Sequence, residues 1–458
     1  MLVRFTVENF LSFRERCEFS MIKGRERLLK HHVVDGEIPL LKAAVIYGAN
    51  ASGKSNLVKA IDVARDMVIQ GARPKEALPI TPFKLDIDCI HKPSRMEFEI
   101  KVGEKYYAYG FVADSKKIHE EWLYAVINKK DKCIFERKTA NSQAPFDLSG
   151  LTEILNSKDR DFLEFTARGT LPNRLFLTEC QERNVRDTIP SAKVLFDVLE
   201  WFQRLTVIFP RSKYGGLENG VHADLDFRQK MGQLLQSFDT GISDLTMVKL
   251  DKPPDFLKKL LPSLQDVLKH SDNSSTSVII EGPEDARYLV TLNDNGNIDF
   301  AQLITRHLQQ SGKRIQPIDF ETREESDGTR RLLDLFPALL RLLQSNAVYV
   351  IDELDRSLHA HVSRKFMSTF FESSQGHPSQ LIVTTHETNL LDQDLLRRDE
   401  IWLVDRDRNN CSKLSSLSDF KVRFDKDLVR DFLMGRYGGV PFLSNVDWLE
   451  NINAKTVK

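Results

Sequence analysis

Eight consecutive residues near the start of the chain have the types and spacing of a phosphate-binding loop. Gly48 and Gly53 bracket four residues, and Lys54 and Ser55 follow directly. Such glycines let backbone N–H groups surround an anion, the lysine ammonium reaches the β- and γ-phosphates, and the serine hydroxyl ligates Mg²⁺. The pattern predicts a nucleoside triphosphate site. Its residues are Gly48, Ala49, Asn50, Ala51, Ser52, Gly53, Lys54, Ser55 and Asn56.

The flanking residues predict the strand and the helix that this loop requires. The apolar run AAVIY before Gly48 is typical of a buried strand. After the loop, Leu57, Ile61, Ala64 and Val68 share one face of a helix. A chance match in a glycine turn is the alternative, and the order strand, loop, helix argues against it.

A second chemical site is predicted where the segment AVYVIDELD ends its apolar run in two acids. Asp352 would hold Mg²⁺, commonly through water, and Glu353 would polarise the attacking water. An Asp-Glu pair alone is weak evidence for a catalytic site, because acidic residues also cap helices. Together with the phosphate loop, it predicts a Walker B carboxylate site.

Three further features follow the same logic. His386 ends the apolar run LIVTT, where it could contact a γ-phosphate or be merely structural. A serine and a glycine at the start of a long helix could clamp a γ-phosphate, although a plain helix cap with a turn glycine has the same pattern. The segment after Glu353 has the spacing of a D-loop. The residues are Ser326, Asp327, Gly328 and Thr329 for the signature loop, and Ser357, Leu358 and His359 for the D-loop.

The order phosphate loop, signature, Walker B, D-loop and switch histidine resembles that of ABC-type AAA ATPases. In that family the signature of one subunit covers the nucleotide of another. The resemblance therefore implies a homo-oligomer, a dimer or higher, with two ATP molecules sandwiched between two heads. It also implies ATP and Mg²⁺ as cofactors.

The elements around these motifs predict an α/β fold, because strands alternate with helices near both ends of the chain. The expected fold is an ABC-type P-loop ATPase head, with a mainly parallel central sheet plus antiparallel strands and a large mixed, partly helical insertion. The expected domains are a split ATPase domain at 1–75 and 315–458, a β-rich lobe at 76–190, and a mainly helical insertion at 191–314 that makes partner or dimer contacts. Within the insertion, two strand-like runs are expected with an Asn-Gly turn at 295–296.

Other segments narrow the resemblance. VENFLSFRE and the asparagine of GANASGKS are typical of the RecF, SMC and OLD group. ITPFKLD, EESDGTRRLLDLFPAL, IDELDRSLHAHV and MGRYGGVP are similar to the RloA/AbiL abortive-infection ATPases. That resemblance implies an ATP-driven sensor and scaffold that restrains or delivers a separately encoded RloB-like or other TOPRIM nuclease, as in the PARIS defence system. A nucleic acid or a phage protein would be its trigger.

The chain departs from the family pattern at several points. The signature reads SDGTR in place of LSGGQ, and Gln181 is only a candidate for the Q-loop glutamine. The segment after His386 is too short for a TOPRIM domain together with the remaining ATPase strand. Asp405 and Asp407 form a D-x-D pattern that reads best as turn acids. We therefore expect no nuclease site in this chain.

Composition excludes other classes. The chain has 65 Lys and Arg residues and 66 Asp and Glu residues. It therefore lacks the overall excess of basic residues that would indicate nucleic-acid binding. With 41% hydrophobic and 29% charged residues the chain is neither disordered nor membrane-embedded. Its five cysteines form no CxxC pair, and the first ten residues alternate like a strand. These features predict a cytoplasmic protein without membrane contact.

Three competing functions remain at this level. A RecF- or SMC-like ATPase of DNA repair or recombination would favour a long coiled coil or a basic face, and neither is evident. A scaffold that binds ATP without turnover is disfavoured by Glu353. A metal-dependent nuclease acting alone would need more carboxylates than Asp352 and Glu353 provide.

Overall fold

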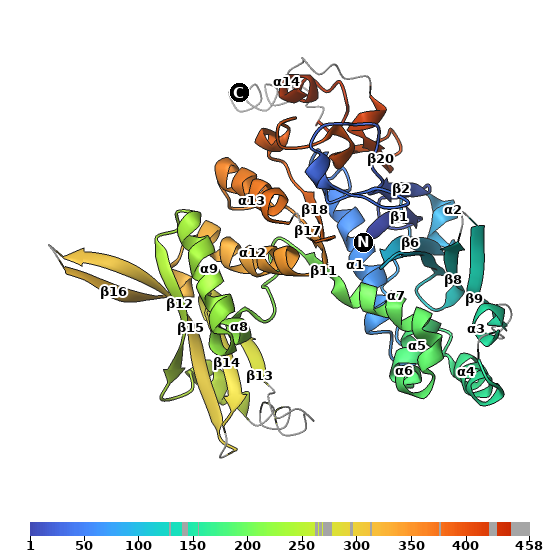
Figure 1. The fold of residues 1–458 in the computed structure, drawn as a ribbon, viewed down its shortest axis with the longest axis horizontal. Coiled ribbons are helices and arrows are strands. Elements are labelled where there is room, and N and C mark those ends of the chain that lie inside the picture. Colours follow the sequence, from blue (N-terminus) through green and yellow to red (C-terminus); the bar gives the residue numbers. More distant parts are fainter. Residues whose placement is uncertain are drawn as a thin grey trace, which may run out of the picture. The chain divides into compact units, whose positions relative to one another are not determined.

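The computed structural model describes residues 1–440 except for 128–129, 140–144, 154, 262–263, 265–267, 269–276, 294–295, 312–313, 375–376 and 421–427. The chain forms two compact units (Figure 1). The phosphate-loop unit comprises Leu2–Gln203 and the chain from Val383 onward. The carboxylate unit comprises Arg204–Ile382. The domain boundaries expected from the sequence stay a prediction.

An antiparallel sheet of seven strands dominates the phosphate-loop unit, in the order β10-β9-β8-β7-β6-β1-β2. The alternation at the start of the chain is confirmed as β1, whose Val3, Phe5 and Val7 are buried. Gly103, at φ 57°, turns β6 into β7. The strands are β1 (Leu2–Glu8), β2 (Cys17–Ser20), β6 (Ser94–Val102), β7 (Lys105–Ala113), β8 (Ile118–Ile127), β9 (Lys130–Lys138) and β10 (Phe146–Asp147).

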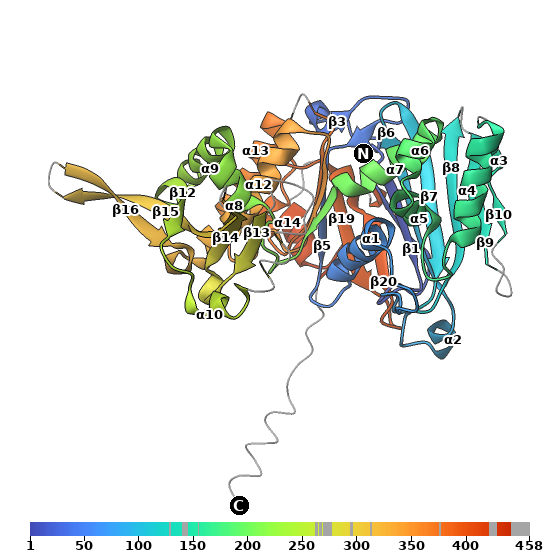
Figure 2. The same cartoon turned by 90° about the horizontal axis from the view of Figure 1, so that it is seen from below.

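Helix α7 (Lys193–Arg204) covers this sheet through aromatic rings. The Phe202 ring lies 5.0 Å from that of Phe98 on β6 and 5.5 Å from that of Tyr109 on β7. Phe98 in turn contacts Phe5 of β1 at 4.7 Å. Large rings bury much apolar area, so this contact anchors the helix. Other helices of the same unit, seen in Figure 2, are α2 (Ile87–Ile90), α3 (Ser149–Thr152), α4 (Ser157–Gly169), α5 (Phe176–Glu182) and α6 (Val185–Thr188).

A second group of strands in this unit carries the phosphate loop. Strand β5 (Ala43–Gly48) is buried throughout, runs parallel to β19 (Ile401–Arg406), and leads into α1 (Lys54–Ile69). The predicted helical face is confirmed, because its four residues are at most 1% exposed. The remaining elements are β3 (Val33–Val34), β4 (Leu40–Leu41), β20 (Ser412–Ser416), antiparallel to β19, and α14 (Leu428–Leu433).

The carboxylate unit contains an antiparallel sheet in the order β12-β15-β14-β13, with β16 added on β15. Helix α9 packs on β12, where Met231 and Leu235 of the helix and Leu245 of the strand are fully buried. The expected Asn-Gly turn includes Asn295, which lies outside the described residues. The elements are α8 (Leu217–Ala223), α9 (Leu225–Ser237), β12 (Ile242–Leu250), α10 (Asp255–Lys258), β13 (Ser277–Glu281), β14 (Arg287–Leu292), β15 (Ile298–Ser311) and β16 (Arg314–Glu321).

Parallel strands and two long helices complete the carboxylate unit. Strand β11 (Leu205–Ile208) runs parallel to β17 (Val348–Ile351), and β18 (Gln380–Thr384) follows β17 in the sheet order. Helices α12 (Asp327–Gln344) and α13 (Ala360–Ser373) lie before and after β17 in the chain. The predicted α/β class, with parallel strands, antiparallel strands and a mixed insertion, is confirmed. Within the described ranges, no helix is both long and apolar enough to cross a membrane.

Candidate functional site

The predicted phosphate loop joins the last residue of a buried strand to the first turn of a helix. Lys54 is only 5% exposed, and its ammonium donates hydrogen bonds to the carbonyl oxygens of Gly48 at 2.6 Å and Ala49 at 3.1 Å. Gly53 has φ 115°, in the left-handed region that glycine adopts at little cost. The loop is therefore curled around the lysine at the start of α1, where the helix dipole favours an anion.

Two serines that the sequence analysis missed support this loop from behind. The Ser412 hydroxyl donates to the Ser52 carbonyl oxygen at 2.5 Å and contacts the Ser12 hydroxyl at 2.7 Å. The Asn56 amide donates to the same Ser12 hydroxyl at 2.8 Å. A Cβ at Gly53 would lie 2.8 Å from that oxygen. Ser12 belongs to the VENFLSFRE segment, which was a signal for it, but no sequence signal marks Ser412.

A pocket of about 220 Å³ is lined in part by the phosphate loop. Its lining brings predicted residues from two distant segments together, because Gly48, Ala49 and Asn50 share it with the exposed His386 at the end of β18. Gln181 lies exposed in α5 and does not line this pocket. The complete lining is Tyr47, Gly48, Ala49, Asn50, Thr385, His386, Thr388, Phe432, Leu433, Gly439 and Val440.

The C-terminal wall of this pocket was not expected. The Phe432 ring packs on Tyr47 with centroids 5.7 Å apart, and a Cβ on Gly439 would lie 3.6 Å from Cα of Gly48. Gly438 and Gly439 have φ of 78° and 74°, so the close approach depends on glycine. The MGRYGGVP segment is thus placed beside the phosphate loop, except for Pro441, which lies outside the described residues.

The two predicted acids lie in the carboxylate unit, directly after β17. Asp352 is 2% exposed, and its backbone N–H donates to the Ile208 carbonyl oxygen at 2.9 Å. Glu353 has φ 51°, a left-handed conformation that costs about 1 kcal/mol or more for a residue other than glycine. The Arg331 guanidinium donates to the carbonyl oxygens of Asp352 at 3.3 Å and Glu353 at 3.4 Å. These contacts fix the backbone of the acid turn.

The predicted signature and D-loop segments meet in the same unit. Ser326 caps α12, and its hydroxyl accepts from the Thr329 backbone N–H at 3.1 Å and contacts the Thr329 hydroxyl at 2.9 Å. A Cβ on Gly328 would lie 2.8 Å from the Ser357 carbonyl oxygen, so the two segments touch at this glycine. The His359 side chain caps α13 by accepting from the N–H of His361 at 3.2 Å.

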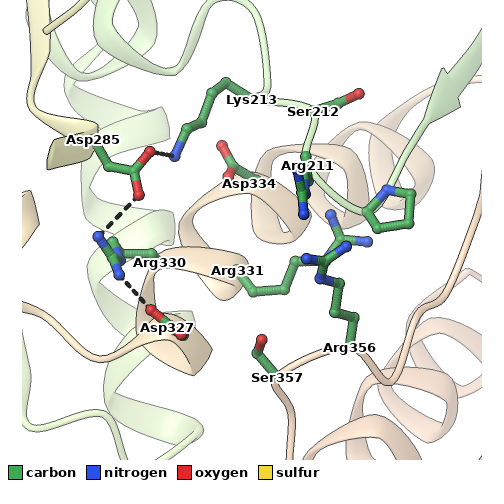
Figure 3. Close-up of a pocket in the computed structure, with 11 residues that line it drawn as sticks. Arg211, Ser212, Lys213, Asp285, Asp327, Arg330, Arg331, Asp334, Arg356 and Ser357 are labelled. Carbon is green, nitrogen blue, oxygen red and sulfur yellow. Dashed lines mark hydrogen bonds and ion pairs between the residues drawn. The ribbon is translucent and has the colours of Figure 1, made fainter. Parts of the chain in front are cut away.

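A pocket of about 290 Å³ lies beside these segments (Figure 3). Asp327, of the predicted signature, and Ser357, of the predicted D-loop, both line it. The rest of its lining is mostly charged. The complete set is Pro210, Arg211, Ser212, Lys213, Asp285, Asp327, Arg330, Arg331, Asp334, Arg356 and Ser357.

The chemistry of the donor set fits a magnesium nucleotide. A serine hydroxyl at Ser55 and a carboxylate at Asp352 are hard oxygen ligands of the kind that Mg²⁺ prefers. Ser55 belongs to the phosphate-loop unit and Asp352 to the carboxylate unit, so each predicted ligand is described within its own unit. Asp407 of the D-x-D pattern has a different environment from these two proposed Mg²⁺ ligands. Its carboxylate accepts hydrogen bonds from the backbone N–H groups of Asn409 and Cys411, both at 2.9 Å, as turn acids do.

A family model described as "AAA domain, putative AbiEii toxin, Type IV TA system" matches residues 43–153 and 218–392, more than half of the chain. The chain belongs to this AAA family. The matched ranges of the AAA protein contain the phosphate loop, the segment 326–329, both acids and His386. Membership confirms the resemblance to AAA ATPases that the motifs predict. No curated protein matches this AAA protein.

Among solved structures, the AAA protein is similar to an SMC head domain from Thermotoga maritima, with 13% identity, 91% and 98% of the two chains covered, and a TM-score of 0.36. It is also similar to an SmcHead bound to the C-winged helix domain of ScpA, with 14% identity, 91% and 97% covered, and a TM-score of 0.36. A third is an Smc head domain with an extended coiled coil, bound to the C-terminal domain of ScpA, derived from Pyrococcus furiosus. It shares 15% identity, with 91% and 97% covered and a TM-score of 0.33.

Proposed function

We propose that the chain binds and hydrolyses ATP with Mg²⁺ as part of an anti-phage, abortive-infection module. In it the chain restrains or activates a separately encoded TOPRIM-like nuclease. The pocket that Gly48, Asn50 and His386 line together carries the ATP proposal. The family description, which names a putative AbiEii toxin of a type IV toxin–antitoxin system, supports the defence role.

The residues have distinct roles in this proposal. Lys54 moves from the loop carbonyls to the β- and γ-phosphates, and the backbone from Gly48 to Ser55 surrounds them. Ser55 and Asp352 hold Mg²⁺, which would offset phosphate charge when bound. Glu353 accepts the proton of the attacking water, and His386 contacts the γ-phosphate. Asp352 and His386 act by position and electrostatics.

Two chains cooperate at each nucleotide in this proposal. The contact between Gly328 and Ser357 supports one continuous surface made of signature and D-loop residues. Such a surface on one chain covers the nucleotide of a second chain, and the reverse holds in a C2 dimer. ATP-dependent self-association is the expected result.

The first experiment measures ATP binding and turnover. Lys54→Ala should weaken ATP binding at least about tenfold, because a charge-assisted contact to phosphate is lost. Glu353→Gln should bind ATP normally, lose turnover and accumulate as dimers or larger assemblies. Arg314→Ala, which removes an exposed charge on β16, is the matched control. Unchanged ATP affinity in Lys54→Ala would refute the assignment of the phosphate loop.

The second experiment identifies the partner. Tagged Glu353→Gln protein is recovered from its native cells with ATP and Mg²⁺, and co-purifying molecules are identified by mass spectrometry. A TOPRIM-like protein at fixed stoichiometry would support the defence role. Nuclease-sensitive DNA without a protein partner would instead support a RecF- or SMC-like repair ATPase.

A further inference from the structure

The pocket beside the start of α12 collects positive charge. The guanidinium groups of Arg211, Arg331 and Arg356 gather on one side of it, from the loop after β11, from α12 and from the turn after β17 (Figure 3). The volume of about 290 Å³ is several times the ~30 Å³ that one water occupies in the liquid. There is room for an anion and its hydrating waters.

The carboxylates of the lining are already engaged by other cations. Asp285 is shared by Lys213 at 3.0 Å and Arg330 at 2.9 Å. Asp334 accepts from Arg287 at 2.7 Å. Neither acid forms an ion pair with the three gathered guanidinium groups among the described residues, and Asp334 compensates Arg331 only in part, through its charge.

The three arginines themselves have little compensation. Among the described residues, no carboxylate lies within ion-pair distance of Arg211, and the Glu353 carboxylate reaches Arg356 only at 3.9 Å. Arg331 is 5% exposed, donates hydrogen bonds to backbone carbonyl oxygens, and has a buried Nε without a hydrogen-bond partner. Burial lowers the pKa of Arg331, the charge of Asp334 partly opposes this, and the charge of Arg356 lowers the pKa further. A buried cation that is only partly compensated is costly, so an anion here would be stabilising.

The expected signature serine lies at the same end of α12, where the Ser326 hydroxyl accepts the N-terminal hydrogen bond of its own helix. The planar guanidinium group of arginine matches phosphate oxygens in charge and in hydrogen-bond geometry. We propose that this pocket binds a phosphoryl group through Arg211, Arg331 and Arg356. The inference deepens the proposed function: the phosphoryl group is the terminal phosphate of an ATP bound to a second copy of the chain, or a free phosphate.

Binding is tested first without the phosphate loop. Pyrophosphate is titrated calorimetrically at low ionic strength into Lys54→Ala protein, in which the loop is disabled. Adding Arg211→Ala and Arg356→Ala should weaken binding about tenfold or more, because charge-assisted hydrogen bonds are lost. Adding Arg314→Ala, the exposed control, should leave it unchanged. The proposal is overturned if Lys54→Ala protein binds no pyrophosphate, or if the double variant and the control bind it equally.

Mixing then distinguishes the two sources of phosphate. Lys54→Ala protein keeps the pocket, and the Arg211→Ala/Arg356→Ala protein keeps the phosphate loop. If ATP turnover is absent in each alone and returns in the mixture, the phosphate comes from a second copy. Arginine-dependent pyrophosphate binding without such recovery assigns the pocket to free phosphate. The titration does not require ATP turnover, so failure of the proposed ATPase is separable from failure of this inference.

Discussion

Nη2 of Arg331 lies 3.4 Å from the carbonyl oxygen of Glu353, and this contact ties the helix that begins at the predicted signature to the turn of the predicted general base. Glu353 has φ 51°, a left-handed backbone conformation that residues other than glycine rarely adopt. An outlier of this kind at a proposed catalytic position is typical of a functional constraint.

Arg331→Gln should lower the turnover number about tenfold while leaving the dissociation constant of ATP at the phosphate loop unchanged. The glutamine is shorter and uncharged, so the acid turn loses its support. Arg331→Lys, which keeps the charge, should recover part of the rate. Steady-state kinetics and equilibrium ATP binding separate the two effects. Equal loss of rate and affinity would contradict a positioning role.

Glu353→Gly and Glu353→Gln should both lose turnover but differ in stability. Glycine tolerates a positive φ, so Glu353→Gly should have a free energy of unfolding higher than that of Glu353→Gln by about 0.5–1 kcal/mol. Urea denaturation of the two variants side by side measures this difference. A glutamine variant of equal or greater stability would show that the backbone at 353 is not strained.

Ser412→Ala should weaken ATP binding about fivefold, which corresponds to one lost hydrogen bond of about 1 kcal/mol. The alanine can no longer hold the Ser52 carbonyl oxygen, so the phosphate loop is less well ordered. Ser237→Ala, on the exposed surface of α9, is the control. Identical ATP affinity in both variants would remove Ser412 from the support of the loop.

Asp62 on α1 gives a prediction about pH. Burial, and to a smaller extent the charge of Asp66, raises its pKa to about 6. The folded state therefore binds more protons than the unfolded state between about pH 4 and pH 6, and stability falls as pH rises through this range. Asp62→Asn should stabilise the protein by about 1 kcal/mol at pH 8, after discounting for solvent screening, and hardly at all at pH 4.5. Thermal unfolding at the two pH values tests this; a gain independent of pH would contradict it.

Local patterns were sufficient for part of the architecture. The run AAVIY, the glycines and the face of α1 are contiguous in sequence, so strand, loop and helix could be predicted from periodicity and loop chemistry. The same holds for β17 and the acids after it. The contacts of Ser412 with the loop and of Phe432 with Tyr47 could not be predicted, because each joins segments hundreds of residues apart. The three arginines of the second pocket also come from separate segments of the sequence, so their meeting in one pocket could not be predicted either.

The serine contacts behind the phosphate loop also bear on how the chain acquires its nucleotide site during synthesis. The loop is complete in sequence by Ser55, yet the hydroxyl that holds Ser52 belongs to a residue 360 positions later. Closing so long a loop carries an entropic cost, and contacts of this separation form late in folding. A ribosome-bound chain that ends before β20 would hold the whole phosphate-loop sequence without its rear support. ATP affinity should therefore mature only after Ser412 has been synthesised and has folded against the loop.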